Sequence, residues 1–313
     1  MNATYSPGMD LRLVLSRNLV LTKLITYLYP ILSVWVIIVN GLTLFVFAKY
    51  KQLQKKRNVM IISLSAVDLF TGMTQFLPKA IGFIVGADKS FAICMTATAV
   101  QIAPPWASIF HLVAVAIERH IAITRPLLYH VIITPTRLAV AVTGNIAAAF
   151  FFALVPLAWP RDQFQDVCLS ILWYPTAYRY MFLIIPMATA LIVVFFLYLH
   201  IYTIARKQER SIAVGVLSNS ESDSSLSNKE SRATRVFILI TGITLACYTP
   251  FWLSMVLLIS WPFKTIVVYM YYISVLCLYA NSGMNFIVYT IRNQEFRSKI
   301  KALFGRRNSN RNE

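Results

Sequence analysis

The sequence predicts an all-α membrane protein, a bundle of seven transmembrane helices followed by a short amphipathic eighth helix. Two observations lead to this fold class. The chain is 58% hydrophobic, above the roughly 45–50% of soluble domains, and its apolar residues gather in seven blocks that each approach the about 20 residues needed to cross a bilayer. Its charged residues, 29 Lys and Arg against 12 Asp and Glu, gather mainly between those blocks.

The blocks divide the chain into three parts. The expected helices cover residues 24–48, 59–84, 92–117, 138–159, 179–205, 233–260 and 266–291. Residues 1–23 precede this bundle of residues 24–291. In residues 292–313, Phe296, Ile300, Leu303 and Phe304 recur at helical spacing among basic residues, which predicts a surface helix followed by a tail. Residues 1–17 contain no apolar run, so we expect the first helix to act as its own insertion signal.

The basic residues predict the orientation. If the N-terminus is extracellular, most of the 29 Lys and Arg fall in the inner loops and the tail, as the positive-inside rule requires. We therefore expect a multi-pass plasma-membrane protein with a cytoplasmic C-terminus, and we assign the net charge of +17 to topology and not to nucleic-acid binding. The sequence Asn2-Ala3-Thr4 predicts glycosylation of Asn2 on the outer side.

A few polar residues lie inside the expected spans. Asp68 lies midway along the second helix, and Asn40, Ser108, Asn281 and Asn285 lie in three others. Because ionisable groups in a membrane are costly, Asp68 is a functional candidate. Two interpretations remain open: a cage for a small cation such as sodium, formed with Ser108, Asn281 and Asn285, or a hydrogen-bond network between helices. Asp68 is essentially the only ionisable residue that we expect within the spans.

Two pairs of cysteines differ in position. Cys94 begins the third helix and Cys168 lies in the loop between the fourth and fifth helices, so both face the oxidising side and are candidates for a disulfide. Cys247 and Cys277 lie within helices, where we expect them to pack as small buried hydrophobes.

The inner end of the third helix carries Glu118-Arg119-His120. Arg119 is either a membrane anchor or one half of a switch whose carboxylate partner is Glu118 or Glu230. If such a pair is exposed, it contributes only about 0–1 kcal/mol. Pro186 and Pro250 predict kinks in the fifth and sixth helices, and each kink is either static or a hinge.

Together these residues resemble the rhodopsin-like, or class A, G-protein-coupled receptors, over nearly the whole chain. The motifs occur in the family's order, one to a helix. They are Asn40-Gly41, Leu64-Ser65-Ala66-Val67-Asp68 (similar to L-A-x-x-D), Glu118-Arg119-His120 (D-R-Y), Cys247-Tyr248-Thr249-Pro250 (C-W-x-P), and Asn281-Ser282 with Asn285-Phe286-Ile287-Val288-Tyr289 (N-S-x-x-N-P-x-x-Y).

Within that class the stretches around Glu118 and His200 look most like the adenosine and melanocortin receptor branch. The ligand-binding residues of adenosine receptors are not matched, because Met255, Trp252 and Tyr279 occupy their positions. Gln101 stands where amine receptors place an Asp, and Tyr279 stands where opsins carry their Lys. The resemblance therefore implies neither a monoamine nor a covalent retinal.

The resemblance implies a receptor, not an enzyme, that transduces the signal of an extracellular small ligand to heterotrimeric G proteins. Arrestin, receptor kinases and membrane lipid are further implied partners. The implied coupling and switch residues are Glu118, Arg119, His120, Glu230, Tyr248, Pro250, Asn285 and Tyr289. The implied ligand pocket is Gln101, Pro105, Tyr248, Trp252, Met255, Leu278 and Tyr279.

Several positions depart from the family pattern. Tyr248 replaces a Trp, Phe286 replaces the Pro of N-P-x-x-Y, and Val194 stands where a fifth-helix Tyr is expected. A receptor-fold protein that does not signal is therefore one alternative. A membrane transporter is another, and it would need a polar path that Asp68 alone does not supply.

Overall fold

The computed structural model describes residues 18–55, 58–85, 91–158, 174–215, 242–261, 264–292 and 294–305. The main helices are α2 (Leu19–Lys49), α3 (Val59–Val85), α4 (Phe91–Thr124), α6 (Pro135–Leu154), α9 (Ile185–Gly215), the helix Gly242–Ser260, α11 (Thr265–Arg292) and α12 (Gln294–Gly305). Short helical pieces join them, namely η1 (Lys51–Leu53), η4 (Pro126–Leu128), α5 (Tyr129–Ile132), η5 (Val155–Ala158), α8 (Thr176–Tyr178) and η6 (Arg179–Ile184).

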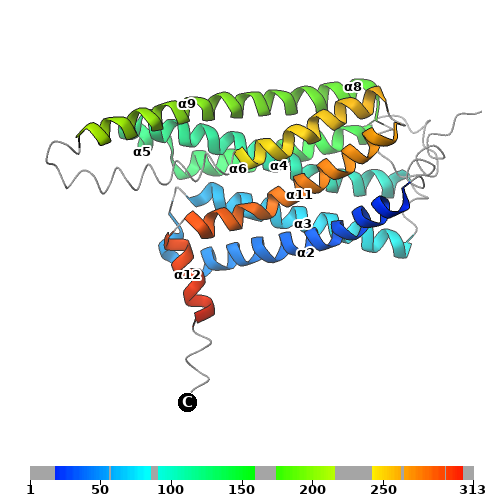
Figure 1. Ribbon diagram of the computed structural model, residues 1–313, viewed down its shortest axis with the longest axis horizontal. Coiled ribbons are helices and arrows are strands. Elements are labelled where there is room, and N and C mark those ends of the chain that lie inside the picture. The colour runs from blue at the N-terminus through cyan, green and yellow to red at the C-terminus, as the bar shows by residue number, and fades with distance from the viewer. Residues whose placement is uncertain are drawn as a thin grey trace, which may run out of the picture.

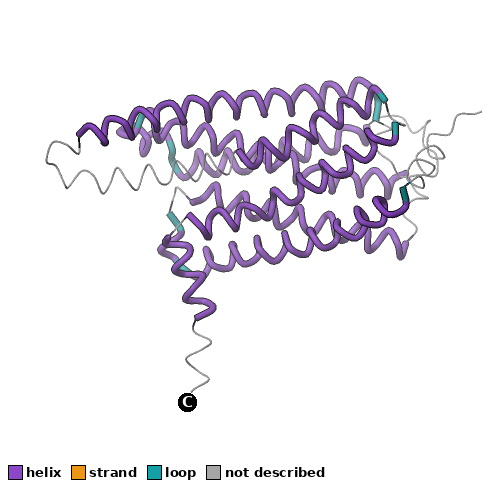
Figure 2. The backbone as a smooth tube through the Cα atoms, viewed as in Figure 1, coloured by secondary structure: helices purple, strands orange, loops and turns teal. Residues whose placement is uncertain are grey.

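The long helices lie side by side in one bundle (Figure 1). The described residues contain helices and loops but no strand (Figure 2). Six of the described helices are long and apolar enough to cross a membrane, and α3 adds the apolar stretch Val59–Gln75. The expected all-α membrane architecture is confirmed.

Several helices run past the apolar blocks that predicted them. α2 begins at Leu19, where Asn18 caps it by accepting a hydrogen bond from the backbone nitrogen of Leu21 at 3.1 Å. α4 continues to Thr124 and α9 to Gly215. Hydropathy predicts which residues contact lipid. A helix, in contrast, ends where its backbone hydrogen bonds end, so it can extend into water through residues that are not apolar.

α4 occupies the centre of the bundle, packed against α3, α6 and α9. It continues helically through Pro104 and Pro105. Proline lacks the backbone N–H that would bond the carbonyl four residues earlier, and for Pro105 that carbonyl belongs to Gln101. The Gln101 carbonyl instead accepts a hydrogen bond from Nε2 of Gln75, on α3, at 3.4 Å. The side chain of Gln75 thus takes the place of a missing backbone donor.

The fifth span also departs from a regular α-helix. Residues Arg179–Ile184 form a π-helical turn immediately before α9, and Pro186 follows at the second position of α9. Such turns insert an extra residue into a helix and rotate what precedes it. The turn brings Leu183 and Ile184 into the buried core of the bundle.

α2 and α11 pack closely along one side of the bundle. A Cβ at Gly283 would overlap the ring of Trp35, so only glycine fits there. α12 leaves the bundle at a steep angle (Figure 1) and tucks a fully buried Phe296 against Phe47, with ring centroids 5.5 Å apart. Phe296 and Ile300 of the predicted surface helix are both buried against the other helices.

Candidate functional site

Asp68 is bound by residues from two other helices. Its side chain, 1% exposed, accepts a hydrogen bond from the Ser108 hydroxyl at 3.1 Å and another from Nδ2 of Asn285 at 2.9 Å. The Ser282 side chain also hydrogen-bonds this carboxyl. The structure therefore joins α3, α4 and α11 through one buried acid.

Two predicted neighbours of Asp68 bond elsewhere. Asn281 accepts a hydrogen bond from Thr244, on the helix Gly242–Ser260, at 3.1 Å. Asn40 donates to the carbonyls of Val36 and Ser282 at 3.0 and 2.9 Å. The buried amide oxygen of Asn40 has no hydrogen-bond partner among the described residues.

These oxygens allow a test of fit for sodium. The Asp68 carboxylate and the Ser108 hydroxyl are the hard oxygen ligands that such a cation prefers, and the Asn40 amide oxygen is a further unsatisfied acceptor. Asn285, in contrast, presents its amide nitrogen to Asp68. The residues fit a small cation once the Asn285 amide turns.

A second site is a cavity of about 270 Å³ near the end of the bundle at which α4 begins. It is called the outer cavity because the sequence predicts that end to be extracellular. It contains six of the seven predicted pocket residues: Gln101, Pro105, Trp252, Met255, Leu278 and Tyr279. Tyr248 does not line it, but is 2% exposed and donates its hydroxyl to the Pro105 carbonyl at 3.2 Å. The remaining lining residues are Ala97, Thr98, Ile102, Trp106, Tyr174, Leu183, Ile184, Met187, Phe251, Tyr271, Tyr272 and Val275.

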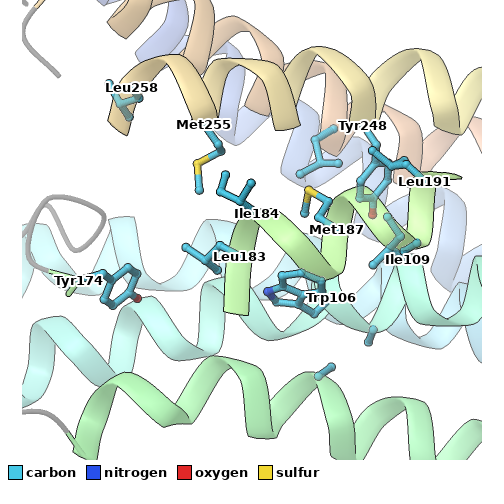
Figure 3. Packing of buried hydrophobic residues seen from close by; sticks show 14 of the residues in the cluster. Trp106, Ile109, Tyr174, Leu183, Ile184, Met187, Leu191, Tyr248, Met255 and Leu258 are labelled. Carbon is cyan, nitrogen blue, oxygen red and sulfur yellow. The ribbon is translucent and has the colours of Figure 1, made fainter. Parts of the chain in front are cut away.

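The cavity walls are mostly apolar and aromatic. Trp106, Ile184, Met187 and Met255 come together from α4, η6, α9 and the helix Gly242–Ser260, respectively (Figure 3). The Trp252 indole is already engaged, since Nε1 donates to the Ile184 carbonyl at 3.0 Å. None of the residues that line this cavity is charged.

At the C-terminal end of α4, which is the inner end in the predicted orientation, Glu118 and Arg119 pair with each other. The Arg119 Nε lies 2.6 Å from Glu118 Oε2, and a terminal guanidinium nitrogen lies 3.0 Å from Oε1. Tyr129, on α5, donates its hydroxyl to the same carboxylate. The side chains are only 13% and 5% exposed, so this ion pair is largely shielded from water. Glu230 lies outside the described residues.

Other positions singled out from the sequence lie on the helix Gly242–Ser260, on α11 and on α9. Pro250 is exposed on the helix Gly242–Ser260, and Tyr289 is buried against Phe296. Val194 is fully buried. One helical turn further along α9, Tyr198 is buried in the same cluster as Tyr289. The family pattern places its fifth-helix tyrosine at position 194, so the comparison of motifs did not single out Tyr198, one turn further along the helix.

Two histidine contacts were missed from the sequence. His111, within α4 and fully buried, bonds the Ser63 hydroxyl at 2.7 Å and the Ala107 carbonyl at 2.8 Å. The expectation that Asp68 is essentially the sole ionisable group in the spans is therefore wrong. His120 bonds His200 at 2.8 Å and so links α4 to α9. The sequence did offer a signal for these contacts, because His111 and His200 each lie within an apolar block.

The cysteines are only partly described. Cys168 and the side chain of Cys94 lie outside the described residues, as does Asn2, so the disulfide and the glycosylation stay predictions. Cys277 is exposed on the outside of the bundle and Cys247 is half-buried, so the expectation that both are buried is wrong for Cys277. In a bilayer that surface faces lipid, where a thiol is tolerated as an apolar group.

The family follows from a comparison with known proteins. Residues 39–289 match the model of the rhodopsin family of seven-transmembrane receptors. The chain belongs to that family. The match covers the spans that carry Asp68, the Glu118–Arg119 pair and the outer cavity.

Among curated proteins, the chain is similar to several small-molecule receptors. Trace amine-associated receptor 9 of Rattus norvegicus is 26% identical over 84% of this chain and 82% of that receptor. Adenosine receptor A2a of Canis lupus familiaris is 26% identical over 88% and 71%. The histamine H2 receptor of Cavia porcellus is 25% identical over 81% and 72%.

This receptor is a multi-pass plasma-membrane protein that responds to a small molecule and signals through G proteins. Its relatives are signalling receptors and not enzymes. The outer cavity and the Glu118–Arg119 pair lie toward opposite ends of α4, so α4 contributes to both the candidate ligand pocket and the candidate coupling site.

Proposed function

We propose that the receptor is activated by a neutral, largely apolar small molecule that enters the outer cavity from the extracellular side. The observation that carries this proposal is the lack of charge among the residues lining a cavity of about 270 Å³. Thr98, Gln101 and the tyrosine hydroxyls offer a few polar contacts to such a ligand. Apolar pockets with a few placed polar groups typically bind ligands of this kind.

A cationic amine fits this cavity poorly, although two of the relatives are named for trace amines and histamine. Burying an ammonium group without a counter-charge is costly. Asp68, the nearest buried carboxylate along the bundle, does not line the cavity, and Ser108 and Asn285 already bond it. The Gln101 amide cannot supply the missing negative charge.

Activation is proposed to pass through Tyr248. Its hydroxyl ties the helix Gly242–Ser260 to the Pro105 carbonyl of α4, and Pro105 lines the cavity. The helix Gly242–Ser260 is proposed to have a resting and an active arrangement. A ligand that contacts Pro105 and Trp252 shifts the equilibrium toward the arrangement that it binds more tightly. Pro250, two residues beyond Tyr248, supplies the kink about which the inner half moves.

The inner ends of α4 and the segment after it are the proposed G-protein surface. Arg119 is the pivot, held in this structure by Glu118. Leu127 of η4 is 94% exposed and Val131 of α5 is 68% exposed, beside the Tyr129 that bonds Glu118. Exposed apolar side chains next to a polar switch are typical of a protein-docking surface.

A sodium ion beside Asp68 is proposed to favour the resting receptor. The Asp68 carboxylate and the Ser108 hydroxyl supply ligands, and Asn285 bonds the same carboxylate. Asn281, the fourth proposed member of the site, is bonded to Thr244 in this structure. Sodium should raise the thermal midpoint of the purified receptor relative to the same concentration of N-methylglucamine. An Asp68→Asn receptor that keeps the full sodium effect would rule out this site.

The orientation, the lock and the outer modifications complete the proposal. The N-terminus is extracellular with Asn2 glycosylated, and Cys94 pairs with Cys168 above the pocket. Peptide mass spectrometry under non-reducing conditions tests the pairing, which two free thiols would contradict. Arrestin and receptor kinases act on the inner side, and Glu230 holds Arg119 in the resting state, so that Glu230→Ala raises basal exchange.

The decisive experiment pairs a ligand screen with a charge exchange at Gln101. Cells expressing the receptor are screened with matched neutral and cationic analogues, and nucleotide exchange on G proteins is measured. Gln101→Asp should weaken a neutral agonist and favour its cationic analogue, whereas Gln101→Asn should change little. A wild-type agonist with an obligatory positive charge would overturn the neutral-ligand proposal. Absent exchange on every G protein, basal and stimulated, would favour a non-signalling receptor fold.

A further inference from the structure

The contact between His120 and His200 joins two helices at the end of the bundle that carries Arg119. His120 lies four residues before the end of α4, and His200 lies within α9. His200 is exposed and His120 is half-buried. Arg125 directly follows α4 and Arg206 lies six residues beyond His200. Because charged side chains mark the edge of the hydrocarbon layer, the histidine pair lies where water and dissolved ions reach it.

The two rings face each other through one nitrogen each. Nε2 of His120 lies 2.8 Å from Nδ1 of His200, and the ring centroids are 5.0 Å apart with planes tilted by 33°. Each neutral imidazole has one nitrogen that carries a proton and one that does not. The unprotonated nitrogen is the commonest metal ligand in proteins. Two candidate ligand atoms, from two different helices, therefore converge on one point.

The spacing of these nitrogens suits a divalent transition metal. Zinc–nitrogen bonds are about 2.0–2.1 Å long, so two nitrogens on one metal lie about 2.9 Å apart at a right angle and about 3.4 Å apart at a tetrahedral angle. Both separations are close to the 2.8 Å of the hydrogen bond. The rings need to turn so that both lone pairs aim at the metal, and the ring torsion of histidine has broad wells. Little movement of α4 or α9 is required.

Exchange of the hydrogen bond for a metal requires both facing nitrogens to be free of protons. The ring that donates in the hydrogen bond moves its proton to its other ring nitrogen by exchange with water, so the neutral pair releases no proton overall. The metal then forms one bond to each ring. Arg125, whose positive charge acts on His120, opposes any cation at this place and limits its affinity.

Two histidines make an open metal site. Among the described residues, no third His, Cys, Asp or Glu completes a group of three, so water fills the remaining coordination positions. Imidazole nitrogen suits zinc, copper and nickel, whereas magnesium and calcium prefer oxygen ligands. We expect a reversible site of modest affinity that selects transition metals over the abundant hard cations.

We propose that His120 and His200 form a binding site for a divalent transition metal such as Zn²⁺, which joins α4 to α9 beside Arg119. The bound metal stabilises the arrangement of this structure, in which Arg119 pairs with Glu118. This effect on the switch rests on the signalling function proposed above, whereas metal binding itself does not.

The test follows the thermal midpoint of the purified full-length receptor, prepared without a histidine tag, as one metal salt at a time is added. A ligand that binds only the folded protein raises the midpoint. Ni²⁺ should act at a lower concentration than Co²⁺, and Co²⁺ at a lower concentration than Mn²⁺, in the order of their affinity for nitrogen ligands. Mg²⁺ should have no effect. No response to Ni²⁺, or an equal response to Mg²⁺, would overturn the proposal.

Matched substitutions locate the ligands. His120→Gln and His200→Gln each keep a hydrogen-bonding side chain but remove one metal ligand. Each should raise the half-maximal Ni²⁺ concentration at least about ten-fold, because the second bond to a held metal is intramolecular. His130→Ala, at an exposed histidine of α5, should leave that concentration unchanged. An unchanged Ni²⁺ response in both glutamine variants would contradict the assignment.

A restored ligand provides the converse experiment. His200→Cys replaces the imidazole by a thiolate, which also binds zinc, so this variant should recover the response to Zn²⁺ that His200→Gln loses. Midpoints measured in EDTA report whether each variant folds. Loss of the Zn²⁺ response in a folded His200→Cys receptor would count against a metal held at this position.

Nucleotide exchange on G proteins separates the site from its effect. Ni²⁺ should lower the basal exchange of the wild type but not that of His200→Gln. A raised midpoint with unchanged exchange would overturn the effect of the metal on the switch. Absence of exchange under every condition would count against the signalling function, while the midpoint series alone decides the metal site.

Discussion

Asp68 and Glu118 are both carboxylates buried in the bundle, yet they are held in different ways. Asp68 is bonded by Ser108 and Asn285, residues far from it in the sequence and on other helices. Glu118 is bonded by its neighbour Arg119 and by Tyr129, only eleven positions along the chain. The first carboxylate ties separate helices together, whereas the second organises one end of α4. We infer that the middle of the bundle supplies cohesion and the inner end supplies a local switch.

The largest expected effect is at the acid that joins three helices. Asp68→Ala leaves the buried donors of Ser108 and Asn285 without their acceptor, at about 1–3 kcal/mol for each. We expect a loss of about 2–5 kcal/mol in stability, measured as the thermal midpoint in detergent. Asp68→Asn keeps one acceptor oxygen and should lose less. Equal midpoints for the two variants would mean that the network does not hold the helices.

Neutralising the inner carboxylate should change signalling more than stability. Glu118→Gln releases Arg119 from its ion pair but keeps an oxygen for Tyr129. If the pair biases the resting state by about 1 kcal/mol, basal nucleotide exchange should rise about five-fold. The measurement is exchange per surface-labelled receptor, with Glu295→Gln on α12 as the control. A drop in the thermal midpoint as large as that of Asp68→Ala would remove the distinction between the two regions.

Removing only the tyrosine hydroxyl is a milder change at the same end. Tyr129→Phe deletes the hydrogen bond from α5 to Glu118 but leaves the Glu118–Arg119 ion pair in place. Basal exchange should rise by less than in Glu118→Gln, and the two substitutions combined should give less than the product of their separate effects. Independent, multiplicative effects would show that Tyr129 does not act through Glu118.

The smallest effect is expected at an exposed ion pair. Lys55 and Glu295 lie 3.1 Å apart and join the segment before α3 to α12, but their side chains are 47% and 50% exposed. Such pairs contribute about 0–1 kcal/mol. Lys55→Gln should leave both the thermal midpoint and basal exchange close to wild type, and a loss comparable to that of Asp68→Ala would show that exposure is a poor guide here.

The fold class could be predicted from the sequence, and six of the seven residues predicted for the ligand pocket line one cavity. Length and hydropathy predict the spans because a segment that crosses a bilayer must satisfy its backbone hydrogen bonds internally, as a helix does. The positions of Gln101 and Trp252 follow from the family's motifs. The contacts could not be predicted in the same way. His111 with Ser63, and His120 with His200, are paired by the packing of helices, which no local pattern encodes. The carboxylate that pairs with Arg119 likewise bonds Tyr129 of α5, a four-residue helix without a hydropathy signal.

The close packing of α2 on α11 has a practical consequence for measuring motion in this receptor. The Gly283–Trp35 contact and the Asn40–Ser282 hydrogen bond fix the position of α2 relative to α11. Phe296 packs α12 against both helices. They form a natural reference frame. A spin label on an exposed position of α12, such as Arg297, would then report distances to the helix Gly242–Ser260 that change only when that helix moves.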